Sequence, residues 1–232
     1  MNIIRNEKLI KRNSRIAQIT VVAGLAVLAA GMFISFRYKE EVTLSMGALL
    51  VGFLLSQIGI YFSNRWGRRP RPDELLDASL KGLDSKYTLY HYSTPVSHLL
   101  LGPAGMWLLL PYHQRGKITF AKGRWRQSGG NIYLKIFAQE SLGRPEMDVV
   151  NEMSRLQSHL SKNLPEEQFP DLKAALVFTN PRTVIDVPED VEAPAETVTL
   201  GKLKETIRKQ GKNKGLSAEK LKLLQDSFGS AE

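Results

Sequence analysis

Two long apolar segments dominate the hydrophobic pattern of the chain. Residues 16–36 and 42–62 contain no charged side chain. As a helix, each would cover roughly 31 Å, about the thickness of the hydrocarbon core of a bilayer. Neither segment has the polar face of a surface helix. A cleaved signal peptide is the alternative for the first segment, but a second segment follows after five residues. The pattern predicts two transmembrane helices.

Small side chains recur at helical spacing in both apolar segments. In the second segment, they are Ser45, Ala48, Gly52, Ser56 and Gly59. In the first segment, they are Ala23, Ala26 and Ala30. Small residues on one face let two helices approach closely in lipid, although Gly and Ala are also common in transmembrane helices generally. We expect the two helices to pack as a hairpin. Neither contains an ionisable residue that could serve a proton or ion pathway.

Residues 72–232 carry shorter hydrophobic patterns, some typical of helices and some typical of strands. Apolar residues at helical spacing predict helices over 72–83, 146–162, 200–210 and 218–228. Short apolar or aromatic runs between Gly and Pro turns predict strands at 87–93, 98–101, 106–110, 117–121, 124–127, 131–137 and 174–179. Residues 187–196 read as an acidic loop that contains proline. This order of elements predicts an α/β (α+β) fold, in which a central mixed sheet is flanked by helices.

The positive charge of the chain is concentrated near the apolar segments. The 232 residues include 32 Lys and Arg against 23 Asp and Glu, a net charge of +9. Residues 1–71 hold 11 basic and 3 acidic side chains, so they account for +8 of this total. The excess flanks both segments, at 1–15 and 65–71, and is small in the turn at 37–41. This bias predicts a protein of the bacterial inner membrane with both termini in the cytoplasm.

The absence of cysteine removes several kinds of chemistry. Disulfides, thiolate metal sites and cysteine nucleophiles are all excluded. No phosphate-binding loop or dinucleotide fingerprint appears in the sequence either. His91, His98 and His113 fall in the predicted strand region, where single histidines are more often core or surface residues than ligands. We therefore expect neither a metal nor a cofactor.

The soluble region nevertheless resembles a known family. Residues 97–109 (SHLLLGPAGMWLL) form a hairpin pattern and residues 176–181 (LVFTNP) a later strand. Glu74 lies in the opening helix, and Leu156 and Leu160 fit a later one. In this order, the segments resemble the nuclease-related domain (NERD) family over residues 72–210, followed by a helical tail at 211–232. The resemblance implies a restriction-endonuclease-like fold.

The same resemblance implies that the catalytic site is degenerate. The family pattern has an Asp before the hairpin His, and a Glu and a Lys five and seven residues after the hairpin Gly. These positions hold Ser97, Leu110 and Tyr112 here. A divalent cation needs several oxygen ligands, and Glu74 is the one family carboxylate that remains. We expect a non-catalytic binding or scaffolding module, a pseudoenzyme; a weak metal-dependent nuclease is an alternative.

A basic stretch leaves the choice of ligand open. No acidic residue lies between Asp84 and Glu140, whereas Trp125 and Tyr133 are interspersed there. The basic residues of this stretch are Lys86, Arg115, Lys117, Lys122, Arg124, Arg126 and Lys135. They suit phosphate or lipid contacts, or form a solvated face balanced by the acidic loop. The lipid bilayer is the expected partner, a protein partner is a further one, and nucleic acid is less favoured. The sequence leaves the oligomeric state open.

Overall fold

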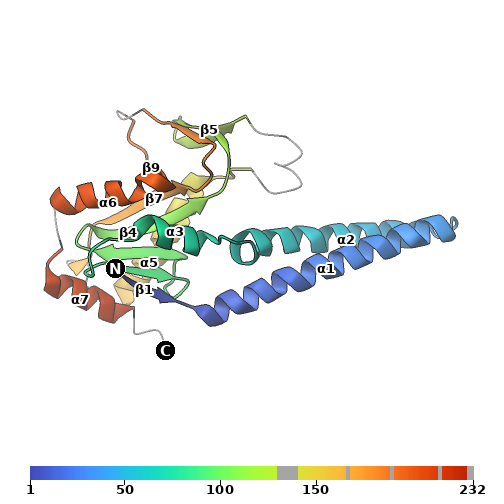
Figure 1. Cartoon of the computed structure of the whole chain (residues 1–232), viewed down its shortest axis with the longest axis horizontal. Coiled ribbons are helices and arrows are strands. Elements are labelled where there is room, and N and C mark those ends of the chain that lie inside the picture. The colour runs from blue at the N-terminus through green and yellow to red at the C-terminus, as the bar shows by residue number, and fades with distance from the viewer. Residues whose placement is uncertain (130–140, 166–167, 189–190, 214–215, 229–232) are drawn as a thin grey trace. The chain divides into compact units, whose positions relative to one another are not determined.

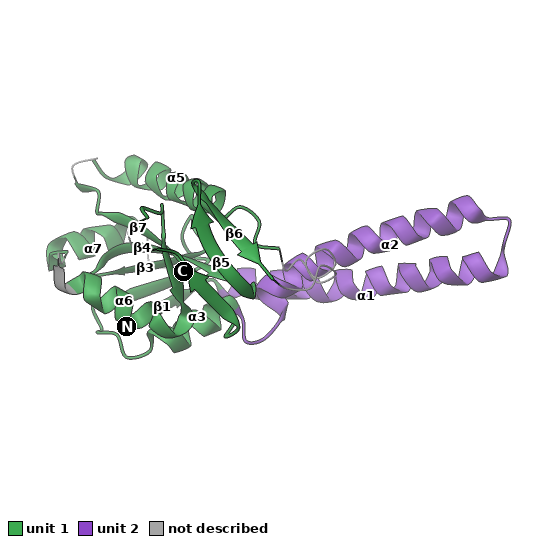
Figure 2. Cartoon of the chain, turned by 90° about the horizontal axis from the view of Figure 1, so that it is seen from above, with its two compact units in different colours: residues 1–6, 72–135, 140–232 green, residues 7–71, 136–139 purple. Residues whose placement is uncertain are grey.

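The computed structural model describes residues 1–129, 141–165, 168–188, 191–213 and 216–228. These residues divide into two compact units (Figure 2). One unit consists of residues 7–71. The other combines residues 1–6 with the described part of residues 72–232. The predicted strand at 131–137 lies outside the described residues.

The smaller unit is an antiparallel pair of helices (Figure 2). Helix α1 runs over Glu7–Arg37 and α2 over Val42–Phe62, and a short π-helical turn follows at Ser63–Gly67. Both helices are long and apolar enough to cross a membrane. Helix α1 begins well before the apolar segment, because residues 7–15 continue the same helix. Many large apolar side chains of this unit are exposed, as expected of a surface that faces lipid.

Glycine lets the backbones of the two helices come close together. The buried small residues recur every seven positions: Ala17, Gly24 and Gly31 in α1, and Ser45, Gly52 and Gly59 in α2. A Cβ atom added to Gly24 would lie 2.8 Å from the Ser56 hydroxyl oxygen, and one added to Gly31 would lie 3.0 Å from the Ala48 Cβ atom. The predicted residues of α2 therefore line the contact.

The prediction for α1 is wrong in detail. Ala26 and Ala30 are exposed and Ala23 is only half-buried, whereas Gly24 and Gly31 face α2. Small residues recur every three or four positions around much of this helix, so their spacing alone does not distinguish its faces. The contact with α2 selects the glycines because they allow the smallest distance between the helix axes.

The larger unit is built around a six-stranded mixed sheet (Figure 1). The strand order is β1-β2-β3-β4-β7-β9, in which β2, β3 and β4 are antiparallel and the other pairs are parallel. The strands span Asn2–Arg5 (β1), Thr88–His91 (β2), His98–Gly102 (β3), Gly105–Tyr112 (β4), Leu172–Phe178 (β7) and Glu196–Thr199 (β9). This confirms the predicted mixed α/β architecture.

Helices cover both faces of this sheet. Helices α3 (Pro72–Leu80) and α6 (Leu200–Asn213) contribute Leu76, Leu80, Leu203 and Ile207 to the core on one face. Helices α5 (Pro145–Asn163) and α7 (Ala218–Ser227) contribute Val149, Leu156, Leu160, Leu221 and Leu224 to the core on the other. The apolar periodicity of the sequence identified these helices because each buries one stripe.

A second sheet of three strands completes the larger unit. Its order is β6-β5-β8, with β5 at Gly116–Ala121, β6 at Arg124–Ser128 and β8 at Thr183–Asp186. The sequence predicted the β5–β6 hairpin, but it missed β1, β8 and β9. Each of these three strands has four residues and pairs in parallel with a strand distant in the chain. A four-residue strand whose partner is distant leaves little hydrophobic pattern in the local sequence from which it could be predicted.

Replacing Gly52 with leucine should destabilise the helical hairpin. A Cβ atom on Gly52 would lie 2.7 Å from the Leu28 Cγ atom and 3.0 Å from the Leu28 backbone nitrogen. Forcing the helices apart should cost about 1–2 kcal/mol. Thermal unfolding of the full chain in detergent, followed by circular dichroism, measures this. Gly47→Leu is the matched control, since a Cβ atom at Gly47 meets nothing within 4 Å. Equal losses from both variants would contradict the packing argument.

Candidate functional site

A buried network of charged and polar side chains lies on the α3 face of the sheet. Helix α3 places Asp73 and Asp77 one turn apart, so both point the same way. Arg5, His91 and His98 lie in one row across β1, β2 and β3, because Arg5 pairs with His91 and His91 with His98 in the strand register. The helix and the strand row together assemble five polar residues in a region that is otherwise apolar.

Direct contacts join the members of this network. The Arg5 Nε atom lies 3.2 Å from Asp73 Oδ2, and Arg5 also pairs with Asp77. His91 Nε2 lies 3.0 Å from Asp77 Oδ1, and His91 Nδ1 lies 2.8 Å from His98 Nδ1. Asp73 and His91 are 0% exposed, and His98 is 1% exposed. The contacts form a continuous chain from Asp73 to His98.

The hydrogen bonds of His91 and His98 limit which of their ring nitrogens can carry a proton. A hydrogen bond between two Nδ1 atoms requires one ring to donate and the other to accept, so the two imidazoles differ in protonation pattern. His91 can donate from Nε2 to the Asp77 carboxylate while it uses Nδ1 toward His98. Burying a charge is costly unless it is paired. Asp73 is fully buried and pairs with Arg5, whereas the side chains of Arg5 and Asp77 are partly exposed.

The network also joins two distant parts of the chain. Arg5 ends β1, two residues before α1 begins, and Asp73 comes two residues after Arg71, the last residue of the hairpin unit. The ion pairs therefore tie the segment before the hairpin to the segment after it. Met1 adds to this anchoring, because its amino group donates to the Leu83 carbonyl oxygen at 3.2 Å.

Ser97 and Leu110 are half-buried and Tyr112 is buried, at the positions where the resemblance implies catalytic residues. Ser97 directly precedes β3, and continuing the register of Leu99 with Leu108 brings it opposite Leu110. Leu110 is half-buried against the core. Tyr112 is buried, stacks on Phe178, and donates its hydroxyl to Asp148 Oδ2 at 2.7 Å.

The described residues offer no group of three His, Asp or Glu side chains positioned to hold a metal ion. Glu74 lies in the first turn of α3, whereas Leu110 and Tyr112 lie in β4. The first turn of a helix is a common place for a carboxylate, because it complements the helix dipole.

Only some of the basic residues of the strand region lie on one common face. Lys117, Arg124 and Arg126 share the exposed face of the β5–β6 hairpin, since Thr119 pairs with Arg126 and Ala121 with Arg124. Lys117 is neutralised there by Asp186, with 2.6 Å between Nζ and Oδ2. Lys122 is exposed in the hairpin turn, Arg115 is half-buried before β5, Lys86 lies in the turn before β2, and Lys135 lies outside the described residues.

Trp125 does not belong to this exposed basic face. Its ring is buried against Phe120, with 4.6 Å between centroids, and its Nε1 atom donates to Thr197 Oγ1 at 3.1 Å. Successive residues of a strand point to opposite sides, so Trp125 faces the core while Arg124 and Arg126 face outward. Trp125 is therefore not available to stack on bases. Tyr133 lies outside the described residues.

Comparison with known proteins does not identify a family. No family model, no curated protein and no solved structure matches the chain. The resemblance to the NERD family therefore stays a prediction from the sequence.

Sequence reasoning missed the buried network. It treated His91 and His98 as separate core or surface residues and did not single out Arg5, Asp73 or Asp77. The available signals were Asp73 and Asp77 at helical spacing in a helix with a leucine stripe, and two histidines symmetric about a hairpin turn. Nothing in the local sequence connects them to Arg5, which is 72 residues before Asp77.

Replacing Asp77 with asparagine should destabilise the larger unit. The change removes the negative charge that pairs with Arg5. Asparagine also has one acceptor oxygen where aspartate has two, so either Arg5 or His91 Nε2 would face an amide NH2 group. We expect a loss of about 1–3 kcal/mol, measured by urea unfolding of the full chain in detergent with tryptophan fluorescence. Asp171→Asn is the control, since Asp171 is exposed, and it should change stability by less than about 0.5 kcal/mol. A wild-type unfolding curve for Asp77→Asn would contradict this role.

Proposed function

We propose that this protein is a membrane-anchored, non-catalytic binding or scaffolding module. Its soluble unit has a restriction-endonuclease-like, NERD-type fold, held at the cytoplasmic face of the bacterial inner membrane. The observed order of α3, the β3–β4 hairpin, α5 and β7 supports this fold, because it follows the order of the segments that carry the family resemblance. No cofactor or metal is required by this proposal.

The identity of the residues at the catalytic positions carries the proposal. Ser97 and Leu110 stand where the family pattern has carboxylates, and Tyr112 stands in place of its lysine. Leucine has no donor atom for a cation, and the Tyr112 hydroxyl is committed to Asp148. A nuclease of this kind needs oxygen ligands for a divalent cation beside the phosphate, and a positive group to support the developing charge. Neither need is met by these three side chains.

The hairpin supports the membrane anchor. Both helices are apolar over a membrane-spanning length. Three of their hydroxyl groups donate to backbone carbonyl oxygens of their own helix: Thr20 to Ile16, Ser45 to Val42 and Ser56 to Gly52. An aromatic cluster of Tyr61, Phe62 and Trp66 follows, of the kind found at the membrane–water boundary. Basic residues on both flanks favour cytoplasmic termini, and thus a multi-pass protein with its soluble unit in the cytoplasm.

Nucleic-acid binding is the second candidate function. Arg124 and Arg126 project from one exposed strand face with Lys122 in the adjoining turn, and such a cluster suits phosphate groups. Two observations weigh against it: Trp125 is buried, and Lys117 is paired with Asp186. The same cluster also suits anionic lipid. A salt-dependent affinity for DNA or RNA that Arg124→Glu abolishes would favour the nucleic-acid function.

The purified full chain should leave DNA and RNA intact in the presence of Mg²⁺ or Mn²⁺. The expected result is no cleavage above that of a mock purification, because Ser97, Leu110 and Tyr112 supply no site for the metal. Gel analysis of labelled substrates measures this. The preparation must be compared with Glu74→Ala, which removes the one family carboxylate that remains. Cleavage by the wild type that disappears in Glu74→Ala would reject the non-catalytic proposal.

The orientation of the hairpin can be tested with single cysteines, because the chain has none of its own. Lys39→Cys, in the turn between the helices, should react with a membrane-impermeant maleimide in intact cells. Glu219→Cys, on the exposed surface of α7, should react only after lysis. This follows from the basic residues on the outer flanks. Labelling of Glu219→Cys in intact cells would overturn the cytoplasmic placement.

A further inference from the structure

Strand β9 forms one edge of the main sheet. Strand β9 is the last strand of the sheet and pairs with β7 on one side. On its other side, no strand of the described chain forms a ladder with it. An edge strand presents a row of backbone N–H and C=O groups that can bind another extended chain. This makes the edge a place where a ligand's backbone can be recognised.

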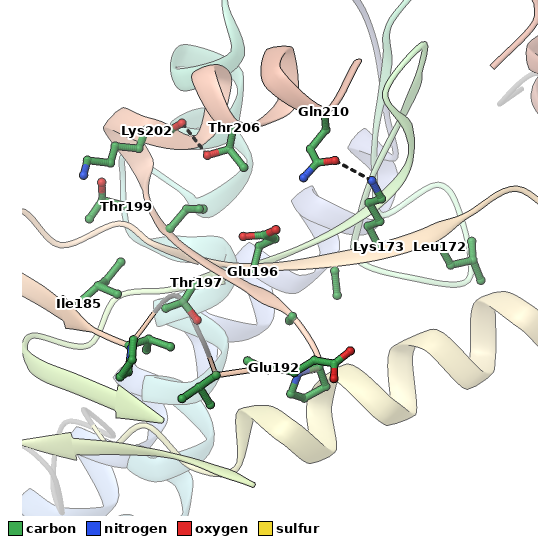
Figure 3. Close-up of a pocket in the computed structure, with 18 residues that line it drawn as sticks. Leu172, Lys173, Ile185, Glu192, Glu196, Thr197, Thr199, Lys202, Thr206 and Gln210 are labelled. Carbon is green, nitrogen blue, oxygen red and sulfur yellow. Dashed lines mark hydrogen bonds between the residues drawn. The ribbon is translucent and has the colours of Figure 1, made fainter. Parts of the chain in front are cut away.

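A cavity of about 850 Å³ runs along this edge (Figure 3). All four residues of β9 line it, together with parts of residues 185–195 and one side of α6. Its volume lies within the range of ordinary binding sites, roughly 300–1,000 Å³. Because β9 runs along the cavity wall, a bound chain could lie beside the strand and fill the cavity with its side chains.

The two sides of the cavity differ in chemistry. On the α6 side are Lys173, Glu196, Lys202, Thr206 and Gln210, which Figure 3 shows around one part of the cavity. On the other side the wall is mostly apolar. Its members include Leu172, Ile185, Val187, Val191 and Ala193. Successive residues of an added strand would point alternately to these two sides. The cavity therefore suits a segment whose side chains alternate between polar and apolar.

Two charged groups on the polar side of the cavity form no ion pair with another described residue. Lys173 Nζ donates to Gln210 Oε1 at 2.9 Å. Among the described residues, in contrast, the Lys202 ammonium and the Glu196 carboxylate form no ion pair or side-chain hydrogen bond, although both line the cavity. A ligand with one acidic and one basic side chain on its polar side would pair with both.

We propose that the edge of β9 binds an extended segment of a partner protein by strand addition. The segment has apolar side chains toward the apolar wall, and an acidic and a basic side chain toward Lys202 and Glu196. This inference rests on the proposed function as a binding module, and it assigns that function an interaction surface and a class of partner. Main-chain hydrogen bonds supply affinity in this mode, and the alternating walls supply specificity.

A second copy of β9 is a poorer occupant of the same edge. The side of β9 that carries Thr197 faces the apolar wall, since Thr197 accepts the hydrogen bond from buried Trp125. A neighbouring copy would offer Thr197 and Thr199 to that wall and no basic residue to Glu196. Neither the apolar surface nor the charge would be complemented. A heterologous segment satisfies both requirements.

The test is selection of peptides on the full chain in lipid nanodiscs. A phage library of random nonapeptides is selected on the wild type and counter-selected on Val191→Asp, which places a charge on the apolar wall. Enriched peptides are expected to alternate apolar and polar residues and to carry both signs of charge. Fluorescence anisotropy then gives the affinity of the best peptide, which Val191→Asp should weaken by about tenfold or more.

Matched variants separate the site from general surface effects. Val184→Asp makes the same change at an exposed position of β8 that does not line the cavity, and it should leave the affinity unchanged. Lys202→Glu should weaken binding by about threefold to tenfold, whereas Lys209→Glu, exposed on α6 outside the cavity, should not. A peptide whose acidic residue is changed to lysine should recover binding to Lys202→Glu.

Backbone methylation tests strand addition itself. Alternate amides of a strand point to the same neighbour, so N-methylation of one alternate set should abolish binding and methylation of the other set should be tolerated. Equal tolerance of both sets would overturn strand addition. Enrichment of no alternating pattern, or equal binding to Val191→Asp and Val184→Asp, would reject the site. A concentration-dependent dimer that Val191→Asp abolishes would instead assign the edge to a second copy.

These failures are distinguishable from failure of the proposed function. Rejection of the β9 site, with the protein still inserted in the membrane and nucleic acid still intact, removes this surface and leaves the anchored, non-catalytic module standing. Nuclease activity that depends on Glu74 removes the proposed function whatever the peptides do.

Discussion

The pairing of Arg5 with Asp73 and Asp77 is the interaction on which the organisation of this protein depends. Arg5 comes before the helical hairpin in the chain, and the two aspartates come after it. Burial makes each of these charges costly unless its partner is present. The first six residues are thereby held in the same unit as residues 72 onward, and β1 extends the sheet beside β2. In the chain, the segment of the hairpin thus lies between two segments of the larger unit.

The two units are held together internally by different forces. In the hairpin, hydroxyl groups bond within their own helices and glycines allow close approach, so dispersion contacts hold the pair. In the larger unit, apolar cores on both faces of the sheet provide most of the stabilisation. The polar network lies within the core on the α3 face. The contrast is the one expected if the hairpin lies in a membrane, as proposed. Burial from water favours apolar contact, whereas lipid chains are as apolar as a leucine side chain.

The positions singled out by the family resemblance and the proposed binding edge lie on different strands of one sheet. The resemblance implies carboxylates at the positions of Ser97 and Leu110 and a lysine at the position of Tyr112. Tyr112 packs in the core, and Leu110 packs against it. At the far edge of the same sheet, β9 keeps an open row of backbone groups beside a two-sided cavity. The packing of α3, α5, α6 and α7 holds the sheet between these two places.

The sequence by itself determined the two apolar helices, the amphipathic helices and the longer strands. Length and absence of charge suffice for α1 and α2, and the periodicity of Leu76, Leu80, Leu156 and Leu160 suffices for α3 and α5. These signals are local. The tertiary structure alone decided that Gly24 and Gly31 face α2, that Trp125 is buried, and that Arg5, Asp77 and His91 meet. Each depends on which distant segment lies opposite, and strands as short as β1 and β9 carry too few residues to specify their partners; the surrounding packing does so.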